Sequence, residues 1–290
     1  MKKKKLLKKI IDLIIAKYDV HSVYLLGSRK EKEVQKLKLE PTVLNNNSGY
    51  TFLLFIIFRG IYKINEKKIQ KFLLKNNYPE YVICPIVYNL SEFLRQIDRG
   101  STFLGQIQAN ISPFYSIDTS IKDLKLEPSH YLVFWKRKTS EWKIRSKRAC
   151  FLLLKAEEYD GSDIDSAAKM SILHDCLQQL CLGLLVVCWD FKPKILQLKY
   201  LLHLCSYYIS LLKENETARL TMNAYHLLLD AHEIMQQNTE IKIQEEESEQ
   251  AAALCSDFLR EAHVIAKNEL NRYHQKCLDY ENKRRKELAH

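Results

Sequence analysis

The sequence predicts an α+β protein in which a small mixed-sheet domain precedes an all-α helical bundle. The chain has 290 residues, of which 47% are hydrophobic, and at about 150 residues per domain this length suggests two domains with a core each. Strand-like runs are confined to residues 1–118, and from residue 149 onward apolar residues recur at helical spacing. We therefore predict an α/β domain over 1–118, a basic connector over 119–148 and a helical bundle over 149–290.

The first domain opens with an amphipathic helix. Residues 6–17, which follow the lysines at 2–5, place charged and apolar residues at helical spacing, and they lack the continuous apolar segment and the cleavage site of a signal peptide. The other helices expected in this domain cover residues 64–76 and 90–98.

Three strands are expected between these helices. Residues 22–26 form a short β-rich run that we expect to end at Gly27-Ser28. The continuous apolar run 50–58 is typical of a central strand covered on both faces. The third strand, 81–88, contains Pro85, which predicts an edge or bulged position.

The connector is strongly basic and contains two tryptophans. Residues 119–150 carry 9 basic and 3 acidic side chains, and the basic ones are interleaved with Trp135 and Trp142. This pattern suits phosphate contact combined with base stacking. The alternative is a helix that starts near Trp142. Its basic face would be solvated, and its two tryptophans would anchor it to the core. The candidate binding residues are Lys136, Arg137, Lys138, Arg145, Lys147 and Arg148.

The second half reads as an antiparallel bundle of four to five helices. Leu173, Leu177, Leu180 and Leu184 recur at spacings of four and three residues, which is the apolar stripe of a packed helix. The wide apolar faces, including Leu180 to Trp189, also predict a homodimer through this half. The helices are expected over residues 151–159, 164–189, 195–212, 218–237 and 244–287.

The charge is distributed unequally between the two halves. The formal net charge is +10; residues 1–150 carry 29 basic and 13 acidic side chains, and residues 151–290 carry 16 and 22. One interpretation is a basic surface for nucleic acid beside an acidic body. The other is a pair of domains that attract each other or a partner of similar charge.

The eight cysteines and the lengths of the apolar runs indicate the cellular compartment. No two cysteines form a C-x-x-C pair, and most stand among apolar residues, which predicts buried free thiols in a reducing cytoplasm and no metal site. The longest apolar runs, 50–58 and 180–189, are near ten residues, whereas a bilayer span needs about 20. We therefore expect a cytoplasmic protein without membrane contact.

The helical half carries two motifs of a known family. One is Leu173-His174-Asp175-Cys176-Leu177-Gln178 on a helix, and the other is the turn Asp190-Phe191-Lys192-Pro193-Lys194. This order resembles the HEPN family (higher eukaryotes and prokaryotes nucleotide-binding), in the variant with Leu-His-Gln-Ala-x-x-Glu followed by Gly-Tyr-x-Pro-Lys. Such proteins often have a nucleotidyltransferase-like domain in front.

The segment Tyr24-Leu25-Leu26-Gly27-Ser28-Arg29 resembles the Gly-Ser turn of that nucleotidyltransferase fold. In active members the turn opens a helix that holds phosphates, and carboxylates on neighbouring strands bind divalent ions. The run 50–54, where this pair is expected, has no carboxylate. The resemblance therefore implies a degenerate domain without metal or cofactor, which keeps a binding surface around Gly27, Ser28, Arg29 and Lys30.

Active HEPN ribonucleases carry an Arg-x(4 to 6)-His motif. In such a pair the arginine holds the scissile phosphate and the imidazole moves protons, so no metal is required. Arg219 and His226 have this spacing. They lie on the third long helix, whereas the family motif lies near the start of the last one. The alternative is an exposed Arg219 near a helix start with a packed His226.

His174 occupies the family's own histidine position. Gln178, four residues later, shares its helix face and can form a hydrogen bond with it. A structural His-Gln pair is one interpretation, and a nucleotide or dimer-interface role is the other.

Three functions follow. The first is a non-catalytic nucleotide- or RNA-binding, regulatory protein of the HEPN plus nucleotidyltransferase-like type, acting as a dimer. The second is a metal-independent, toxin-like HEPN endoribonuclease that uses Arg219 and His226. The third is a nucleotidyltransferase that attaches AMP to RNA or protein. Metal dependence distinguishes them, because the second needs no divalent ion and the third does.

Overall fold

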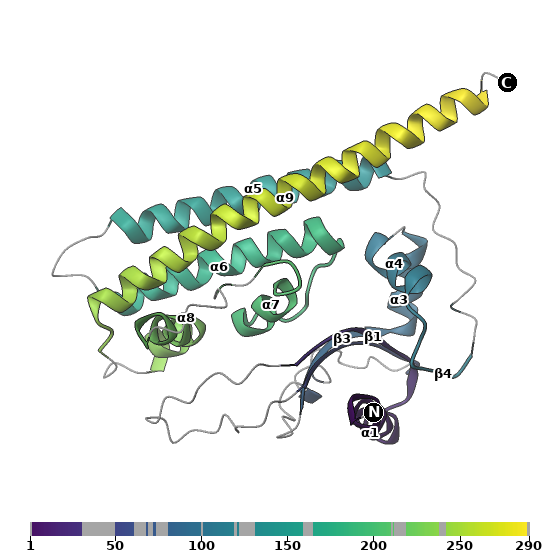
Figure 1. The fold of residues 1–290 in the computed structure, drawn as a ribbon, viewed down its shortest axis with the longest axis horizontal. Coiled ribbons are helices and arrows are strands. Elements are labelled where there is room, and N and C mark those ends of the chain that lie inside the picture. Colours follow the sequence, from purple (N-terminus) through teal and green to yellow (C-terminus); the bar gives the residue numbers. More distant parts are fainter. Residues whose placement is uncertain are drawn as a thin grey trace. The chain divides into compact units, whose positions relative to one another are not determined.

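The computed structural model describes residues 2–30, 50–60, 68, 72–73, 81–99, 101–118, 121, 131–158, 165–209, 211, 219–237 and 242–288. The chain divides into two compact units, Met1–Glu127 and Pro128–His290. The described strands all belong to the first unit, and the second is helical (Figure 1). The α+β class predicted from the sequence is therefore confirmed.

Four strands form the mixed sheet of the first unit, in the order β3-β2-β1-β4. β1 runs antiparallel to β2 and β4, whereas β2 and β3 are parallel. Their bounds are β1 Val20–Lys30, β2 Tyr50–Phe58, β3 Tyr81–Asn89 and β4 Tyr115–Ser116.

β2 and β3 occupy the positions that the sequence predicts. Every residue of β2 after Tyr50 is buried, as expected for a central strand. β3 lies at the edge of the sheet, where a strand has one partner and proline is tolerated. Pro85 pairs there with Leu54.

Helices cover both faces of the sheet (Figure 1). α1 (Lys2–Lys17) packs its apolar side chains against one face, where Leu7 and Ile10 join a core with Phe52 and Leu54 of β2. The other face of β2 carries Phe55, whose ring contacts aromatic rings of two further helices. These are α3 (Leu90–Asp98) and α4 (Thr102–Asn110), which contribute Phe93 and Phe103.

The segment around Gly27 differs from the prediction. The strand does not end at Gly27-Ser28, because β1 continues to Lys30 and pairs with β2 throughout, with Gly27 opposite Leu53 and Ser28 opposite Phe52. A register shift between Leu25 and Gly27 absorbs one extra residue in the manner of a β-bulge. Of the helix expected over 64–76, only residues 68, 72 and 73 are described, and these are helical.

The second unit contains the predicted bundle. α6 lies against α5, α7, α8 and α9, and α5 and α9 run side by side (Figure 1). The helices are α5 Tyr131–Glu158, α6 Ser166–Trp189, α7 Leu198–Cys205, α8 Arg219–Gln237 and α9 Glu245–Leu288.

α6 is the core helix of this unit. Its residues 180–188 are all buried within the chain, so the apolar face on which we based the homodimer is already covered by neighbouring helices. By length and composition α6 is also apolar enough to cross a membrane, but 72% of its most apolar window is buried inside the fold. A helix that is apolar on all sides and buried in this way is typical of a large core.

Residues 131–148 of the expected connector belong to α5. This helix begins at Tyr131 rather than near Trp142, and it continues without interruption past residue 148. Between its ends it contains neither glycine nor proline, and its buried residues 134, 138, 142, 146, 149, 153 and 156 recur at helical spacing. Along the chain, the boundary between the two units falls between residues 127 and 128.

Candidate functional site

Four exposed cations of α5 make up what we call the cationic stripe. Lys136, Lys143 and Lys147 follow one face of the helix, and Arg148 lies about 100° around the helix axis from Lys147. All four side chains are exposed, and no ion pair among the described residues involves them. Lys136 and Lys147 are eleven residues apart, about 16 Å along a helix. The only carboxylate of α5 before its last turn is Glu141. It is paired with Arg145 and Lys192, so this part of α5 supplies no counter-charge to the stripe.

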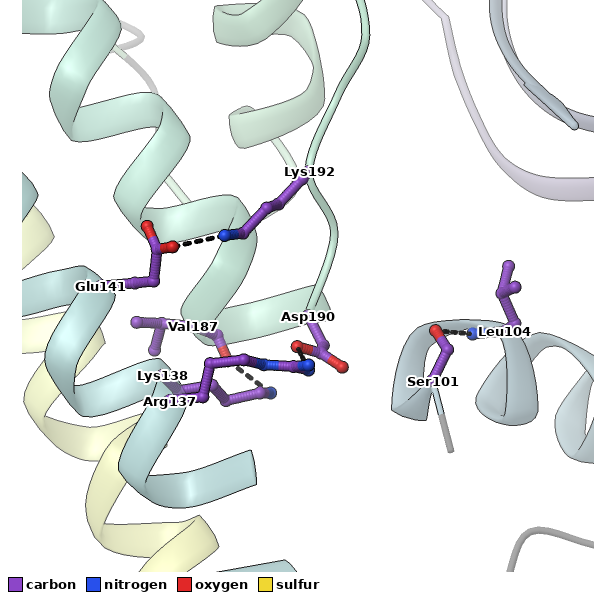
Figure 2. Close-up of polar contacts among 8 residues, drawn as sticks. All are labelled: Ser101, Leu104, Arg137, Lys138, Glu141, Val187, Asp190 and Lys192. Atoms are coloured by element: carbon purple, nitrogen blue, oxygen red, sulfur yellow. Dashed lines mark hydrogen bonds and ion pairs between the residues drawn. The ribbon is translucent and has the colours of Figure 1, made fainter. Parts of the chain in front are cut away.

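Lys138 belongs to the same basic segment but points into the bundle. Its side chain is completely buried, and its ammonium donates a hydrogen bond of 2.9 Å to the carbonyl oxygen of Val187 (Figure 2). The same nitrogen lies 3.8 Å from the ring centre of Tyr273. Burial lowers the pKa of Lys138 to about 8. The expectation that Lys138 contacts a ligand is therefore wrong, because it stabilises the end of α6.

Two more basic side chains of the segment have partners within the protein. Arg137 forms an ion pair with Asp190 (Figure 2), the residue that ends α6 in the left-handed conformation with φ 56°. Arg145 donates a hydrogen bond of 3.0 Å to Gln179 and lies 3.3 Å from Glu141. Of the six residues proposed for this segment, the structure leaves Lys136, Lys147 and Arg148 free to contact a ligand.

A groove of about 440 Å³ opens between α5 and α9 beside the stripe. Two indoles form its floor, and we call it the indole groove. Its lining residues are Trp135, Thr139, Trp142, His263, Val264, Lys267, Leu270 and Asn271.

Both indoles are held by packing. Trp135 stacks on His274, with ring centres 4.5 Å apart, and Trp142 meets His263 edge to face at 5.3 Å. Trp142 also packs against Gly183 of α6, where a Cβ atom would lie 2.9 Å from the indole. Only glycine gives the indole room at that position, so the tryptophans do anchor α5 to the core, as one interpretation expected.

The α9 wall of the groove was not identified from the sequence. Lys267 and Asn271 are exposed there, and they supply a cation and an amide beside the indoles. Their spacing of four residues from each other and from His263 is the only signal in the sequence. It does not indicate which other helix lies opposite.

His174 is buried between α6 and α8. Its Nδ1 lies 2.8 Å from the carbonyl oxygen of Leu228, so in the neutral ring this nitrogen carries the proton and donates. Burial lowers the pKa of His174, and this outweighs the opposing effect of the Leu228 hydrogen bond. His174 is thus a neutral structural histidine, as one interpretation expected.

The partner expected for His174 was wrong. Gln178 instead donates a hydrogen bond of 2.8 Å to the carbonyl oxygen of Leu196. The ring beside His174 belongs to His232 of α8, with centres 4.1 Å apart. The Nε2 of His232 lies 3.1 Å from Asp175, so the two helices are joined by a histidine pair that nothing in the sequence singles out.

The candidate catalytic pair lies on α8. Arg219 begins the helix and His226 follows seven residues later, which places both Cβ atoms on one face. His226 is exposed, with its ring 5.6 Å from that of Tyr225, so the expectation that it is packed is wrong. The Arg219 side chain lies outside the described residues.

The remaining predicted site residues lie in the first unit. Gly27, Ser28, Arg29 and Lys30 belong to β1 rather than to a turn that opens a helix, so their backbone N–H groups are not arranged as a helix N-terminus. Within the described ranges no group of three or more His, Cys, Asp or Glu side chains is placed to hold a metal ion.

All eight cysteines are unpaired thiols, and seven are buried. Burial raises the pKa of Cys176 and of Cys188 to about 12, which keeps both protonated and unreactive at neutral pH.

Comparison with known proteins identifies no relative: no protein-family model, no curated protein and no solved structure matches this chain.

Proposed function

We propose that this protein binds RNA without cleaving it, and that α5 is the element that contacts the RNA. The observation that carries the proposal is the cationic stripe, in which four exposed basic side chains share one helix and none of them forms an ion pair among the described residues. Phosphate neutralisation by lysine and arginine supplies most of the affinity of proteins for nucleic acid in general. A regulatory role of the HEPN plus nucleotidyltransferase-like type is part of the same proposal and is supported by the motif order in the sequence.

The rest of the molecule supports a binding role over a catalytic one. The β2 strand, where metal-binding carboxylates would be needed for nucleotide transfer, consists of apolar and hydroxyl side chains. His174 is buried and neutral, so it is poorly suited to exchange protons with a substrate. The exposed pair partner His226 keeps the endoribonuclease alternative testable.

The homodimer remains a prediction, now with a different surface. Because residues 180–188 are buried within the chain, we propose that Phe151 and Leu154 of α5 form the contact. Both are 58% exposed, and an aliphatic–aromatic pair of this kind is favourable to cover. A monomer by light scattering at micromolar concentration would contradict this.

RNA binding by fluorescence anisotropy tests the function. We expect binding of a labelled single-stranded RNA at 50 mM salt and a steep loss of affinity at 200 mM. AMP is the comparison ligand, since equal affinity for AMP and RNA would contradict an RNA-binding role.

The same RNA, incubated with the protein in EDTA, should stay intact. Cleavage that disappears in His226→Ala would instead establish the endoribonuclease and overturn the non-catalytic proposal. ATP-dependent transfer of label to RNA or protein would restore the nucleotidyltransferase reading.

A further inference from the structure

We propose that the indole groove binds an unpaired base, so that the ligand of this protein is single-stranded RNA rather than duplex RNA. This inference rests on the proposed RNA-binding function and names the substrate class of the same surface. It depends on the size and chemistry of the groove, on its position beside the stripe, and on the geometry of RNA.

The groove has the size and the lining of a site for a flat ring. Its volume of about 440 Å³ lies within the range of small-ligand sites, roughly 300–1,000 Å³. Aromatic side chains such as indoles are platforms on which bases stack, and stacking tolerates any base because every base has a π-face. Lys267 and Asn271 at the rim provide donors for base edges and phosphate.

The groove and the stripe are continuous on α5. Successive side chains of a helix are turned by 100° around its axis. Viewed down the axis of α5, Thr139 therefore lies between the side on which Trp135 and Trp142 project and the side on which Lys136 and Lys143 project. Thr139 itself lines the groove, so the cations begin at its rim. A strand whose phosphates follow Lys136 and Lys143 therefore brings a base toward Trp135, which is the partly exposed indole, while the buried Trp142 closes the groove behind it.

The charges of the groove complement a nucleic acid. None of its lining residues is acidic, and Lys267 lies on the wall opposite to the stripe. Cations thus flank the indoles on both sides. An apolar peptide segment would cover the same indoles but would gain nothing from three surrounding lysines, which is why we assign the groove to a base.

Duplex RNA does not supply such a base. In an A-form helix the bases are paired and stacked, and their edges lie in grooves that side chains read poorly. A duplex can contact the stripe through phosphates, but it cannot place a base on an indole without unpairing. Preference for the single strand is therefore the signature of an occupied indole groove.

Substitution of Val264 tests this inference. Val264 lines the groove and is 57% exposed, so Val264→Trp fills the groove with little expected effect on folding. Val133 is 64% exposed on the opposite side of α5, and Val133→Trp is the matched control. The probes are a labelled 12-nucleotide oligouridine and a blunt duplex of equal length, with binding measured by anisotropy at 50 mM salt.

We expect Val264→Trp to lower affinity for oligouridine about tenfold, the loss of roughly one stacked base, and to leave duplex binding unchanged. Val133→Trp should bind both probes as the wild type does. Trp135→Ala, which removes a stacking surface, is the second variant and should act in the same direction. Circular dichroism and the unfolding midpoint of each variant check that the fold is retained.

Two results would overturn the inference. One of them leaves the proposed RNA-binding function intact, and the other contradicts that function as well. If the wild type binds oligouridine and substitution of the stripe lysines weakens binding, but Val264→Trp and Val133→Trp behave alike, the base site is wrong and the RNA-binding function stands. If the wild type binds neither probe at 50 mM salt, the proposed function itself fails.

Discussion

The two lysine-rich helices, α1 and α5, use their charges in different ways. In α1 every lysine whose side chain is described is exposed, and the opposite face packs on the sheet. In α5 one lysine is completely buried, two arginines are paired with Asp190 and Glu141, and four exposed cations form the cationic stripe beside an aromatic groove. Similar composition therefore accompanies two distinct arrangements of charge.

The difference shows that charge alone does not define a binding site. A solvated cationic face such as that of α1 attracts any polyanion weakly and is screened by salt. The stripe of α5 adds stacking surfaces at a fixed distance, and stacking favours one class of nucleic acid. The basic residues of α5 should thus divide into those that stabilise the bundle and those that bind.

The largest expected effect is on stability, at Lys138. Lys138→Ala removes buried methylenes and leaves the carbonyl oxygen of Val187 without its donor. At pH 10, where the folded Lys138 is uncharged, this should lower the free energy of unfolding by about 3 kcal/mol. The matched change in α1, Lys8→Ala at an exposed position, should stay within about 0.5 kcal/mol. Urea denaturation of both variants measures this. Equal losses of stability in the two variants would contradict the different roles of lysine in α1 and α5.

The pH dependence of Lys138 is the next effect in size. Burial lowers its pKa to about 8 in the folded protein, against an ordinary value of 10.5. Between these values the unfolded chain binds more protons, so the wild type gains stability as pH rises through this window. Relative to Lys138→Met, which does not titrate, the gain from pH 8 to pH 10 should be about 2 kcal/mol. A constant difference across urea titrations at these pH values would contradict the burial of a charged amine.

A smaller effect is expected at Arg137. Its side chain is partly exposed, but the Asp190 carboxylate that it contacts is buried, so Arg137→Ala should cost about 1 kcal/mol. Lys143→Ala, at a stripe residue in the same helix, should leave stability unchanged within about 0.5 kcal/mol. Thermal unfolding compares the two. If Lys143→Ala were destabilised as much as Arg137→Ala, the stripe residues would be stabilising the bundle rather than being available for binding.

The sequence predicted most of the fold, because regular periodicity signals elements well. The apolar run of β2, the proline of β3 and the heptad-like leucines of α6 each indicated the right element. The strand β1 was placed too short, because Gly27-Ser28 has the composition of a turn and only pairing with β2 keeps it extended. The start of α5 was missed because basic residues separate the buried positions 134, 138 and 142, and position 138 is itself a lysine, so the apolar periodicity is weak there.

The candidate site was only half predictable. The basic-aromatic pattern of α5 identified Trp135, Trp142 and the stripe, since both lie on one helix. The other wall depends on which face of α9 meets α5, and that is set by packing such as the contact of Trp142 with Gly183. Lys138 was predicted to bind a ligand like its exposed neighbours because all of them are basic. Its helical spacing from the buried residues 134 and 142 turns it toward the core.

The dependence of RNA affinity on salt tests the central claim most directly. For a single strand the slope of log K against log salt is about −0.7 per neutralised phosphate. Replacement of Lys136, Lys143 and Lys147 by alanine should reduce its magnitude by about 2, whereas replacement of Lys4, Lys5 and Lys8 in α1 should leave the slope of the wild type. Equal slopes for the wild type and the α5 variant, or an equal reduction in both variants, would contradict the assignment of RNA binding to α5.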